Sequence, residues 1–597
     1  MNVKLLLALG TLVTAQSVFA GSISKEIEVI EDGLRGSVQF SGDPSWTIEE
    51  RMEHYGVPGV SVAVIKDYKI HWIKHYGITD KETGKAVDEN TLFQAGSISK
   101  PVAAYGALKL VEQKELSLDA PVNKQLVGWK IPDNEFTKKR PVALKHLLNH
   151  SAGLTVHGFG GYSVYDAVPT TEQVLDGIAP ANSAAVRVNI EPETQFRYSG
   201  GGYTVMQKLV ADVSQAEYPQ IMDKLVLSPL AMTRSTYQQP LPPEKLKFAA
   251  AGYLPNNEPV PGKRHTYPEM AAAGLWTTAE DLAKFAIDVQ LAVKENKSPV
   301  LSQAMANQML TPFVSDNTGL GFFIDDKNSE IYFGHGGWDE GFSADLIAHK
   351  TRGYGVVIMT NSNHPSFINE LKNSVADYYQ WHNFSAPTYT ALPISQAEQQ
   401  RIVGRYRYAP DMMFNIFAEN NRVFMQYLDD EKMEVFRIGD NQYIRREHDL
   451  KFRFEKRPKS NSVDLIFGVN GEQEYIRQRL KDDEIVPFEL VVKGEIDKAE
   501  QHYKEFFTEH PGEKGYVEWS LHNRADKLSR DSQTDMALKV LQLSSRLFAS
   551  SSRSFEKLAS HYQQSGEKEN AITSFKKALE LQPDNPPVIQ ALEELTQ

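Results

Sequence analysis

The chain has 597 residues, more than one hydrophobic core can organise, so we expect two to four domains. Hydrophobic residues make up 41% and charged residues 24%, which is an ordinary globular composition. The formal net charge is −13 and no basic patch stands out, which argues against a nucleic-acid partner. The chain has no cysteine, so it has no disulfide and no cysteine for a lipid anchor.

Residues 1–20 are organised like a secretory signal peptide. Lys4 supplies the positive charge, residues 5–13 the short apolar core, and residues 18–20 a small-residue cleavage site. The apolar core is too short to span a bilayer, and no long apolar run follows it. We therefore expect a periplasmic or secreted protein with no transmembrane span after signal removal; an uncleaved N-terminal anchor is the alternative.

The next segments alternate between polar and structured patterns. Residues 21–43 are polar and are expected to be flexible, and Trp46 to Tyr55 is expected to be a helix. Two strands should follow, joined by a turn at Asp67-Tyr68: Gly59 to Ile65 and Ile70 to Tyr76.

The middle of the chain, from about 115 to 290, has a mostly helical pattern. It includes an expected helix over 144–154 that ends at a Gly153 cap, and another that opens at Thr277 or Thr278. Strand patterns return between 319 and 361: Leu320 to Ile324, Ile331 to His335, Phe342 to Ala348 and Gly355 to Met359. Strands at both ends with helices between predict one antiparallel sheet and a helical second lobe, with a cleft between the lobes.

Two further regions follow this α+β domain, which we place at 44–385. Residues 393–480 read as a small antiparallel β module, a half-open barrel, with turns at Asn420-Asn421 and Asn470-Gly471. Residues 484–597 are helical, and their apolar positions recur at the 34-residue spacing of tetratricopeptide repeats. Such repeats either present a groove to a protein partner or only buttress the enzyme.

The stretch Phe93 to Val111 is the strongest candidate for chemistry. Gly96 suits a tight turn, and the run after Ser97 reads as a buried helix. Ser97 and Lys100 then share one helix face, about 5–6 Å apart at their Cβ atoms. A serine needs a base within hydrogen-bond reach, and a lysine in an apolar helix has a lowered pKa. Ser-x-x-Lys here therefore predicts a nucleophile with its own base.

The pattern alone is weak evidence. Ser-x-x-Lys occurs five times in the chain, and the alternative for Ser97 is a plain helix cap. Tyr198 could shuttle a proton near a lysine, although a lone tyrosine is more often a core residue. The run His335-Gly336-Gly337-Trp338 ends a strand, where its glycines would let a substrate lie against the edge. A backbone N–H there could form an oxyanion hole with that of Ser97.

Together, these motifs resemble the penicillin-recognising serine hydrolases, in the branch with AmpC-like β-lactamases, D-Ala-D-Ala carboxypeptidases, D-aminopeptidases and related esterases. The resemblance runs from about 45 to 383. It also rests on three further motifs, Leu147 to Leu154, Pro229 to Thr233 and Ala273 to Leu282. It implies a β-lactamase-like two-lobe fold. We expect no cofactor and no metal, since the sequence has no His-Glu-x-x-His zinc helix and no Walker phosphate loop.

The resemblance also implies roles. Ser97 looks like the acylated nucleophile, Lys100 its base or proton relay, and Tyr198 the tyrosine that passes the proton to the leaving group and activates water. His335-Gly336-Gly337 stands where the family has Lys/His-Thr/Ser-Gly, and the N–H groups of Ser97 and Trp338 would form the oxyanion hole.

Two positions depart from the family pattern. The family's Tyr-x-Asn is Tyr198-Ser199-Gly200 here, which removes an amide that holds the substrate. Gly336 replaces Thr or Ser, which removes a hydroxyl that helps to bind a substrate carboxylate, and His335 is mostly neutral at pH 7. These changes weaken the case for β-lactam hydrolysis. His150 is expected to be structural, at the end of its helix.

We therefore predict an exported serine hydrolase that acts on a small ester or a peptide, of esterase, D-amino-acid peptidase or carboxypeptidase type. The alternative is a catalytically idle penicillin-binding-like scaffold that docks partners through its helical tail.

Overall fold

The computed structural model describes residues 22–596 except 328, 382, 429, 448, 459–461, 469–473 and 584. The expected signal peptide and the Asn470-Gly471 turn lie outside these residues. The chain divides into two compact units, residues 1–35 with 44–386 and residues 36–43 with 387–597. Within the described part of the chain, no helix has the length and apolarity needed to cross a membrane.

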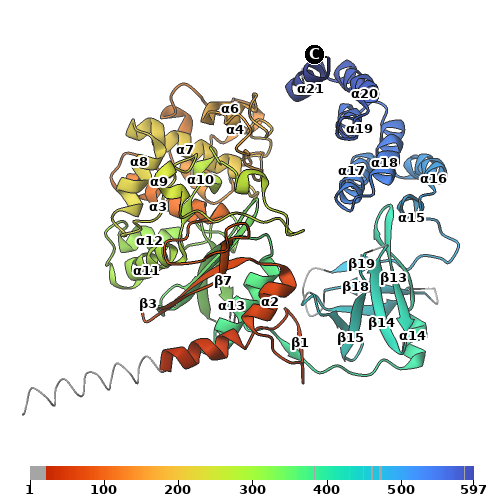
Figure 1. Ribbon diagram of the computed structural model, residues 1–597, viewed down its shortest axis with the longest axis horizontal. Helices are drawn as coiled ribbons and strands as arrows, with labels where there is room; N and C mark the ends of the chain where they lie inside the picture. The colour runs from red at the N-terminus through yellow and green to blue at the C-terminus, as the bar shows by residue number, and fades with distance from the viewer. Residues whose placement is uncertain are drawn as a thin grey trace, which may run out of the picture. The chain divides into compact units, whose positions relative to one another are not determined.

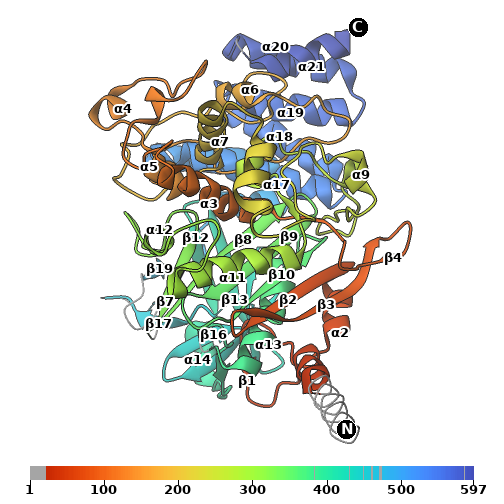
Figure 2. The ribbon, with the colours of Figure 1, turned by 90° about the vertical axis from the view of Figure 1, so that its left-hand side faces the viewer.

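The first unit is built on a seven-stranded antiparallel sheet (Figure 1), whose strands follow the order β4-β3-β2-β10-β9-β8-β7 (Figure 2). Its strands are β2 (Gly59–Lys66), β3 (Lys69–Asp80), β4 (Lys85–Ala86), β7 (Phe323–Lys327), β8 (Glu330–Asp339), β9 (Phe342–His349) and β10 (Gly355–Thr360). The pairing of β2 with β10 joins the early strands to the late ones. This confirms the sheet predicted from both ends of the domain.

Alternating residues of β2 explain why both faces of the sheet are covered. Val62 and Val64 lie in one core, and Ala63 and Ile65 lie in another. The first core is covered by α2 (Ile48–Tyr55) and α13 (Pro365–Tyr379), and α11 (Ala279–Glu295) packs on the opposite face (Figure 2). Thr278 caps α11, as one of the two predicted caps.

The second lobe is helical and forms around α3. Its helices are α3 (Ser99–Glu112), α4 (Glu135–Lys139), α5 (Leu144–Leu148), α6 (Thr171–Asp176), α7 (Gly200–Ser214), α8 (Tyr218–Met222), α9 (Pro243–Leu246), α10 (Met270–Ala273) and α12 (Gln303–Met309). Most of α3 is buried, as its alanine-rich sequence predicts. The sheet and this lobe give the predicted α+β, two-lobe architecture.

Two sequence expectations differ from the structure. Within 21–43, residues 22–31 form a helix whose Ile27 and Ile30 are buried against the sheet, so the flexible segment expected there is wrong for this helix. The helix expected over 144–154 ends at Leu148, because Asn149 caps it and His150 adopts a φ of 60°. Gly153, with a φ of 65°, belongs to the following turn.

The second unit begins with an antiparallel meander of eight strands. They are β12 (Gly404–Ala409), β13 (Met412–Glu419), β14 (Arg422–Tyr427), β15 (Met433–Gly439), β16 (Gln442–Arg445), β17 (Phe452–Lys456), β18 (Val463–Phe467) and β19 (Tyr475–Arg477). Residues 478–480 return to β12, where Leu480 N donates to Arg405 O at 2.8 Å and Arg407 N to Gln478 O at 2.8 Å. The module is therefore a closed barrel, so the half-open barrel predicted above is wrong, and a cluster of aromatic and aliphatic side chains fills it.

Three shorter elements accompany the barrel. The two-residue strands β1 (Gln39–Phe40) and β11 (Thr388–Tyr389) pair with each other, and α14 (Gln396–Ile402) precedes β12. The strand β1 is the reason why residues 36–43 belong to this unit.

The tail is a series of packed helices. They are α15 (Pro487–Val492), α16 (Ile496–Glu509), α17 (Lys514–Arg530), α18 (Thr534–Leu547), α19 (Ser552–Gln564), α20 (Lys568–Leu581) and α21 (Pro586–Thr596). Helices α18 and α20 begin and end 34 residues apart, which agrees with the predicted spacing. Helix α16 begins 38 residues before α18, so it does not continue the 34-residue spacing. The tetratricopeptide assignment itself stays a prediction.

Candidate active site

Ser97 lies in a short turn rather than in the helix proper. The strands β5 (Phe93–Gln94) and β6 (Trp276–Thr277) pair, and a 3-10 turn over Gly96–Ile98 then leads into α3. Gly96 has a φ of 51°, which a side chain would strain. The turn places Ser97 at the mouth of the buried helix that carries Lys100.

Lys100 holds the Ser97 hydroxyl. Its Nζ donates to Ser97 Oγ at 2.9 Å and to Ala272 O of α10 at 2.8 Å, and the side chain is buried. The same Nζ lies 4.9 Å from the centre of the Tyr198 ring and 5.8 Å from that of Tyr203. The amine therefore has two polar partners and an aromatic wall, and in its neutral form it can accept the proton released by Ser97.

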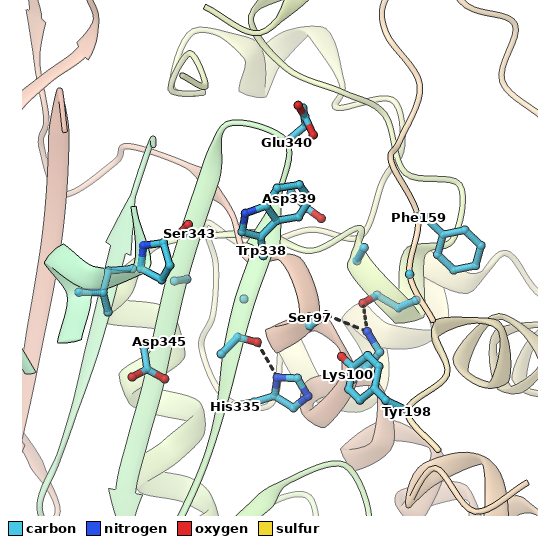
Figure 3. Close-up of a pocket in the computed structure, with 18 of the residues that line it drawn as sticks. Ser97, Lys100, Phe159, Tyr198, His335, Trp338, Asp339, Glu340, Ser343 and Asp345 are labelled. Atoms are coloured by element: carbon cyan, nitrogen blue, oxygen red, sulfur yellow. Dashed lines mark hydrogen bonds between the residues drawn. The ribbon is translucent and has the colours of Figure 1, made fainter. Parts of the chain in front are cut away.

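Tyr198 stands next to this pair, just before the Ser199 cap of α7 (Figure 3). Its ring stacks on His150 at 4.2 Å between centroids and on Phe323 of β7 at 6.3 Å. Its hydroxyl makes no hydrogen bond to another described residue, so it is available to a ligand. The structure thus brings together Ser97, Lys100 and Tyr198, the three predicted catalytic side chains.

The end of β8 forms the other wall. The β7 ladder reaches only Gly334, so residues 335–339 present a strand edge to the site. A Cβ on Gly337 would lie 2.1 Å from Ala95 O, and one on Gly96 would lie 2.4 Å from Trp338 N. Two glycines therefore let the strand touch the turn of Ser97, which places Trp338 N close to Gly96, the residue before the nucleophile. The Trp338 side chain is 50% exposed at the mouth.

His335 is a neutral group in this site. Its Nδ1 lies 2.6 Å from Gly336 O, which can only accept, so we assign the proton to Nδ1. Burial, and then the nearby charge of Lys100, lower the pKa of His335 to about 3. Its buried Nε2 has no partner among the described residues. His335 therefore offers a hydrogen-bond acceptor and no positive charge at neutral pH.

Gly336 has no side chain, so it leaves space in the cavity that a larger residue would occupy. A Cβ there would meet no atom within 4 Å. The cavity has a volume of about 840 Å³ and continues past Gly336 to Asp345 of β9, which forms a 2.7 Å ion pair with Lys372 of α13. Figure 3 shows Ser343 and Asp345 on one side of the β8 edge and the Ser97–Lys100 pair on the other.

Two buried carboxyl groups near the site were not identified from the sequence. Asp339 is 1% exposed and Glu269 is fully buried, and none of their four carboxyl oxygens has a hydrogen-bond partner among the described residues. Burial raises the pKa of Asp339 well above its usual value and that of Glu269 to about 8. No sequence pattern marks a carboxyl group as buried, so neither residue gave a signal.

The described part of the chain offers no cluster of metal ligands. Within the ranges that the structure describes, no group of three or more His, Asp or Glu side chains is placed to hold a metal ion.

Comparisons with known proteins place the first unit in a family. Residues 46–379 match the family described as Beta-lactamase, close to the 45–383 predicted above. Protein flp of Staphylococcus aureus (strain MW2) is 24% identical over 346 residues, 56% of this chain and 66% of that protein. The chain thus spans just under two thirds of the length of that relative.

One further curated protein and one solved structure are similar to the chain. Penicillin-binding protein 4 of Amycolatopsis lactamdurans is 27% identical over 336 residues, 52% of this chain and 82% of that protein. The structure of the octameric penicillin-binding protein homologue from Pyrococcus abyssi aligns with a TM-score of 0.48 and 23% identity, covering 72% of this chain and 98% of that one. Because the family match covers more than half of its residues, the chain belongs to the Beta-lactamase family, the penicillin-binding and β-lactamase-fold serine hydrolases.

Proposed function

We propose that this protein is an exported serine hydrolase that forms an acyl-enzyme on Ser97. The observation that supports this most directly is the 2.9 Å hydrogen bond between Lys100 Nζ and Ser97 Oγ in a cavity large enough for a small substrate. The signal-like residues 1–20 support export to the periplasm or the medium.

The reaction follows from these contacts. Ser97 Oγ attacks the substrate carbonyl while its proton passes to Lys100 Nζ, and the N–H groups of Ser97 and Trp338 stabilise the oxyanion. Tyr198 delivers a proton to the leaving group. In the second half, the Tyr198 phenolate takes a proton from water, which attacks the acyl-enzyme, and the protonated Lys100 returns its proton to Ser97 Oγ as the acyl–oxygen bond breaks.

The substrate that we propose is a small ester or an amide of peptide type, including D-amino-acid peptides, rather than a β-lactam. Gly336 has no hydroxyl for a substrate carboxylate, and His335 has no charge at neutral pH. Position 200 is a glycine, so it supplies no amide. None of these changes touches Ser97 or Lys100.

The decisive experiment is active-site labelling with a matched serine control. The wild-type protein is incubated with a fluorophosphonate and with a fluorescent penicillin, and the modified peptide is identified by mass spectrometry. Ser97→Ala should lose the label and at least about 10³-fold in ester turnover. Ser565→Ala, which alters an exposed Ser-x-x-Lys of the tail, should change neither. Absence of label on wild-type Ser97 with both probes would favour the idle scaffold.

We also propose that the helical tail binds a protein partner. The stacked helices α17 to α20 support this, because serial helical hairpins expose a continuous face. Deletion of 552–597 removes α19 to α21, which have a small core of their own. If the tail serves binding, the deletion should leave ester hydrolysis within about twofold of the full chain. A large fall in hydrolysis would identify the tail as a buttress instead.

A further inference from the structure

The backbone on both sides of Tyr198 is bonded to a single residue, His150. Arg197 N donates to His150 O at 2.7 Å, and Ser199 N donates to His150 Nδ1 at 3.1 Å. The imidazole also stacks on the Tyr198 ring, with a centroid distance of 4.2 Å and an interplanar angle of 29°. His150 therefore fixes the backbone before and after the tyrosine as well as one face of its ring.

His150 is itself held firmly. It is 3% exposed and has a φ of 60°, a left-handed conformation that is uncommon for residues other than glycine. Asn149 Oδ1 accepts from the backbone N–H of Ser151, and the Tyr203 hydroxyl donates to Leu148 O at 2.8 Å. The turn that carries His150 is thus tied to α7, the helix that begins beside Tyr198.

The hydrogen bond from Ser199 defines the form of the imidazole. Since Nδ1 accepts an N–H, the ring proton is on Nε2 and the ring is neutral. Burial, followed by the positive charge of Lys100, keeps the pKa of His150 well below its ordinary value. A proton on Nδ1 would face the Ser199 N–H and break the contact.

We propose that His150 is a positioning residue for Tyr198, holding the phenol beside Ser97 and Lys100 through the stack and the bond to Ser199. This inference rests on the proposed function, in which Tyr198 activates the deacylating water. A misplacement of about 1 Å in a catalytic group can cost about 100-fold in rate. Loss of the stack on Tyr198 and of the bond to Ser199 should therefore slow deacylation and spare acylation by an ester with a good leaving group.

Three substitutions of His150 separate its ring stack on Tyr198 from its hydrogen bond with Ser199 N–H. His150→Asn keeps an acceptor near Ser199 N–H but has no ring, His150→Phe keeps a ring without the acceptor, and His150→Ala has neither. With a p-nitrophenyl ester, we expect all three to keep a stoichiometric burst of p-nitrophenol and to lose turnover. His150→Ala should lose about 100-fold and the other two less. The acyl-enzyme should accumulate on the Ser97 peptide.

A double-mutant comparison distinguishes positioning from general stability. If His150 acts through Tyr198, His150→Phe should cost little further turnover in a Tyr198→Phe background. Independent losses in the two backgrounds would overturn the proposal, as would wild-type turnover in both His150→Asn and His150→Phe. If His150→Ala fails to fold, the other two variants still decide. Absence of covalent label on the wild-type Ser97 peptide would instead count against the Ser97 mechanism.

Discussion

Gly337 of β8 lies so close to Ala95 that a single added carbon would sit 2.1 Å from the Ala95 carbonyl oxygen. This approach joins the strand edge to the turn of the nucleophile, and it depends on the missing side chain. We predict that Gly337→Ala destabilises the protein by about 1–3 kcal/mol, as overpacked sites do, and abolishes labelling of Ser97.

The adjacent glycine provides the matched control for stability. Gly336→Ala adds the same carbon where no atom lies within 4 Å, so its melting temperature should equal that of the wild type. Equal melting temperatures for Gly337→Ala and Gly336→Ala would show that the missing side chain of Gly337 is not what lets β8 lie against Ala95.

Restoring a hydroxyl at Gly336 should improve recognition of a carboxylate. A new hydrogen bond contributes about 0.5–1.5 kcal/mol, so Gly336→Ser should raise the rate of Ser97 acylation by a fluorescent penicillin by about 2- to 10-fold. The measurement is the labelling rate at several penicillin concentrations, with Gly336→Ala as the control. If Gly336→Ser and Gly336→Ala label at the same rate, the missing hydroxyl does not limit β-lactam recognition.

Glu269 should destabilise the protein as the pH rises. Its pKa in the folded state is about 8, above the ordinary 4.5, because the carboxyl group is buried without a partner among the described residues. Between these values the unfolded chain releases a proton that the folded chain retains, so stability falls from pH 4.5 to pH 8. The loss is on the order of 4 kcal/mol.

Replacement of Glu269 by glutamine, its neutral isostere, tests whether this carboxyl group makes stability depend on pH. Glu269→Gln should raise the melting temperature at pH 8.5 more than at pH 5, because the glutamine has no proton to lose. Glu53→Gln, at an exposed position of α2, should change neither value. An equal shift at both pH values would show that burial of Glu269 does not couple stability to pH.

The tail should weaken in acid through His522. Its Nε2 lies 3.0 Å from Ser544 Oγ and 3.2 Å from Ser554 Oγ, and burial lowers the pKa of His522 to about 4. The unfolded chain binds a proton near pH 6.5, so stability is full above 6.5 and falls as the pH drops to 4, by up to about 3 kcal/mol.

Circular dichroism of helix melting measures this effect. His522→Gln should flatten the dependence of the melting midpoint on pH between 6.5 and 4, whereas His510→Gln, at an exposed position, should retain it. A wild-type slope in His522→Gln would assign the acid sensitivity to another group.

The sequence predicted those features that follow from periodicity and spacing. Alternation in β2 and the apolar run of α3 placed the sheet and the buried helix, and Ser-x-x-Lys located the Ser97–Lys100 pair. It did not predict the helix at 22–31, although Ile27 and Ile30 lie three residues apart on one face. Short helices in polar segments give little signal, because packing rather than propensity stabilises them.

Contacts between distant segments were harder to predict. The structural role expected for His150 stays a prediction, and its stack on Tyr198 depends on a left-handed turn after α5 that no residue type required. Asp339 follows Trp338 in a strand where alternation alone does not distinguish a buried carboxylate from an exposed one. Such features arise from the tertiary structure, which local patterns do not encode.

The closed barrel has a consequence for synthesis on the ribosome. Strand β12 obtains its last backbone partner only from residues 478–480, with Arg405 and Leu480 separated by 75 residues. At roughly 5–20 residues per second, β12 waits about 4–15 s for that partner to emerge. Throughout this interval the nascent sheet has two open edges that can pair with a neighbouring chain. A truncated chain that ends before residue 478 lacks this partner of β12, so both edges of its sheet stay unpaired.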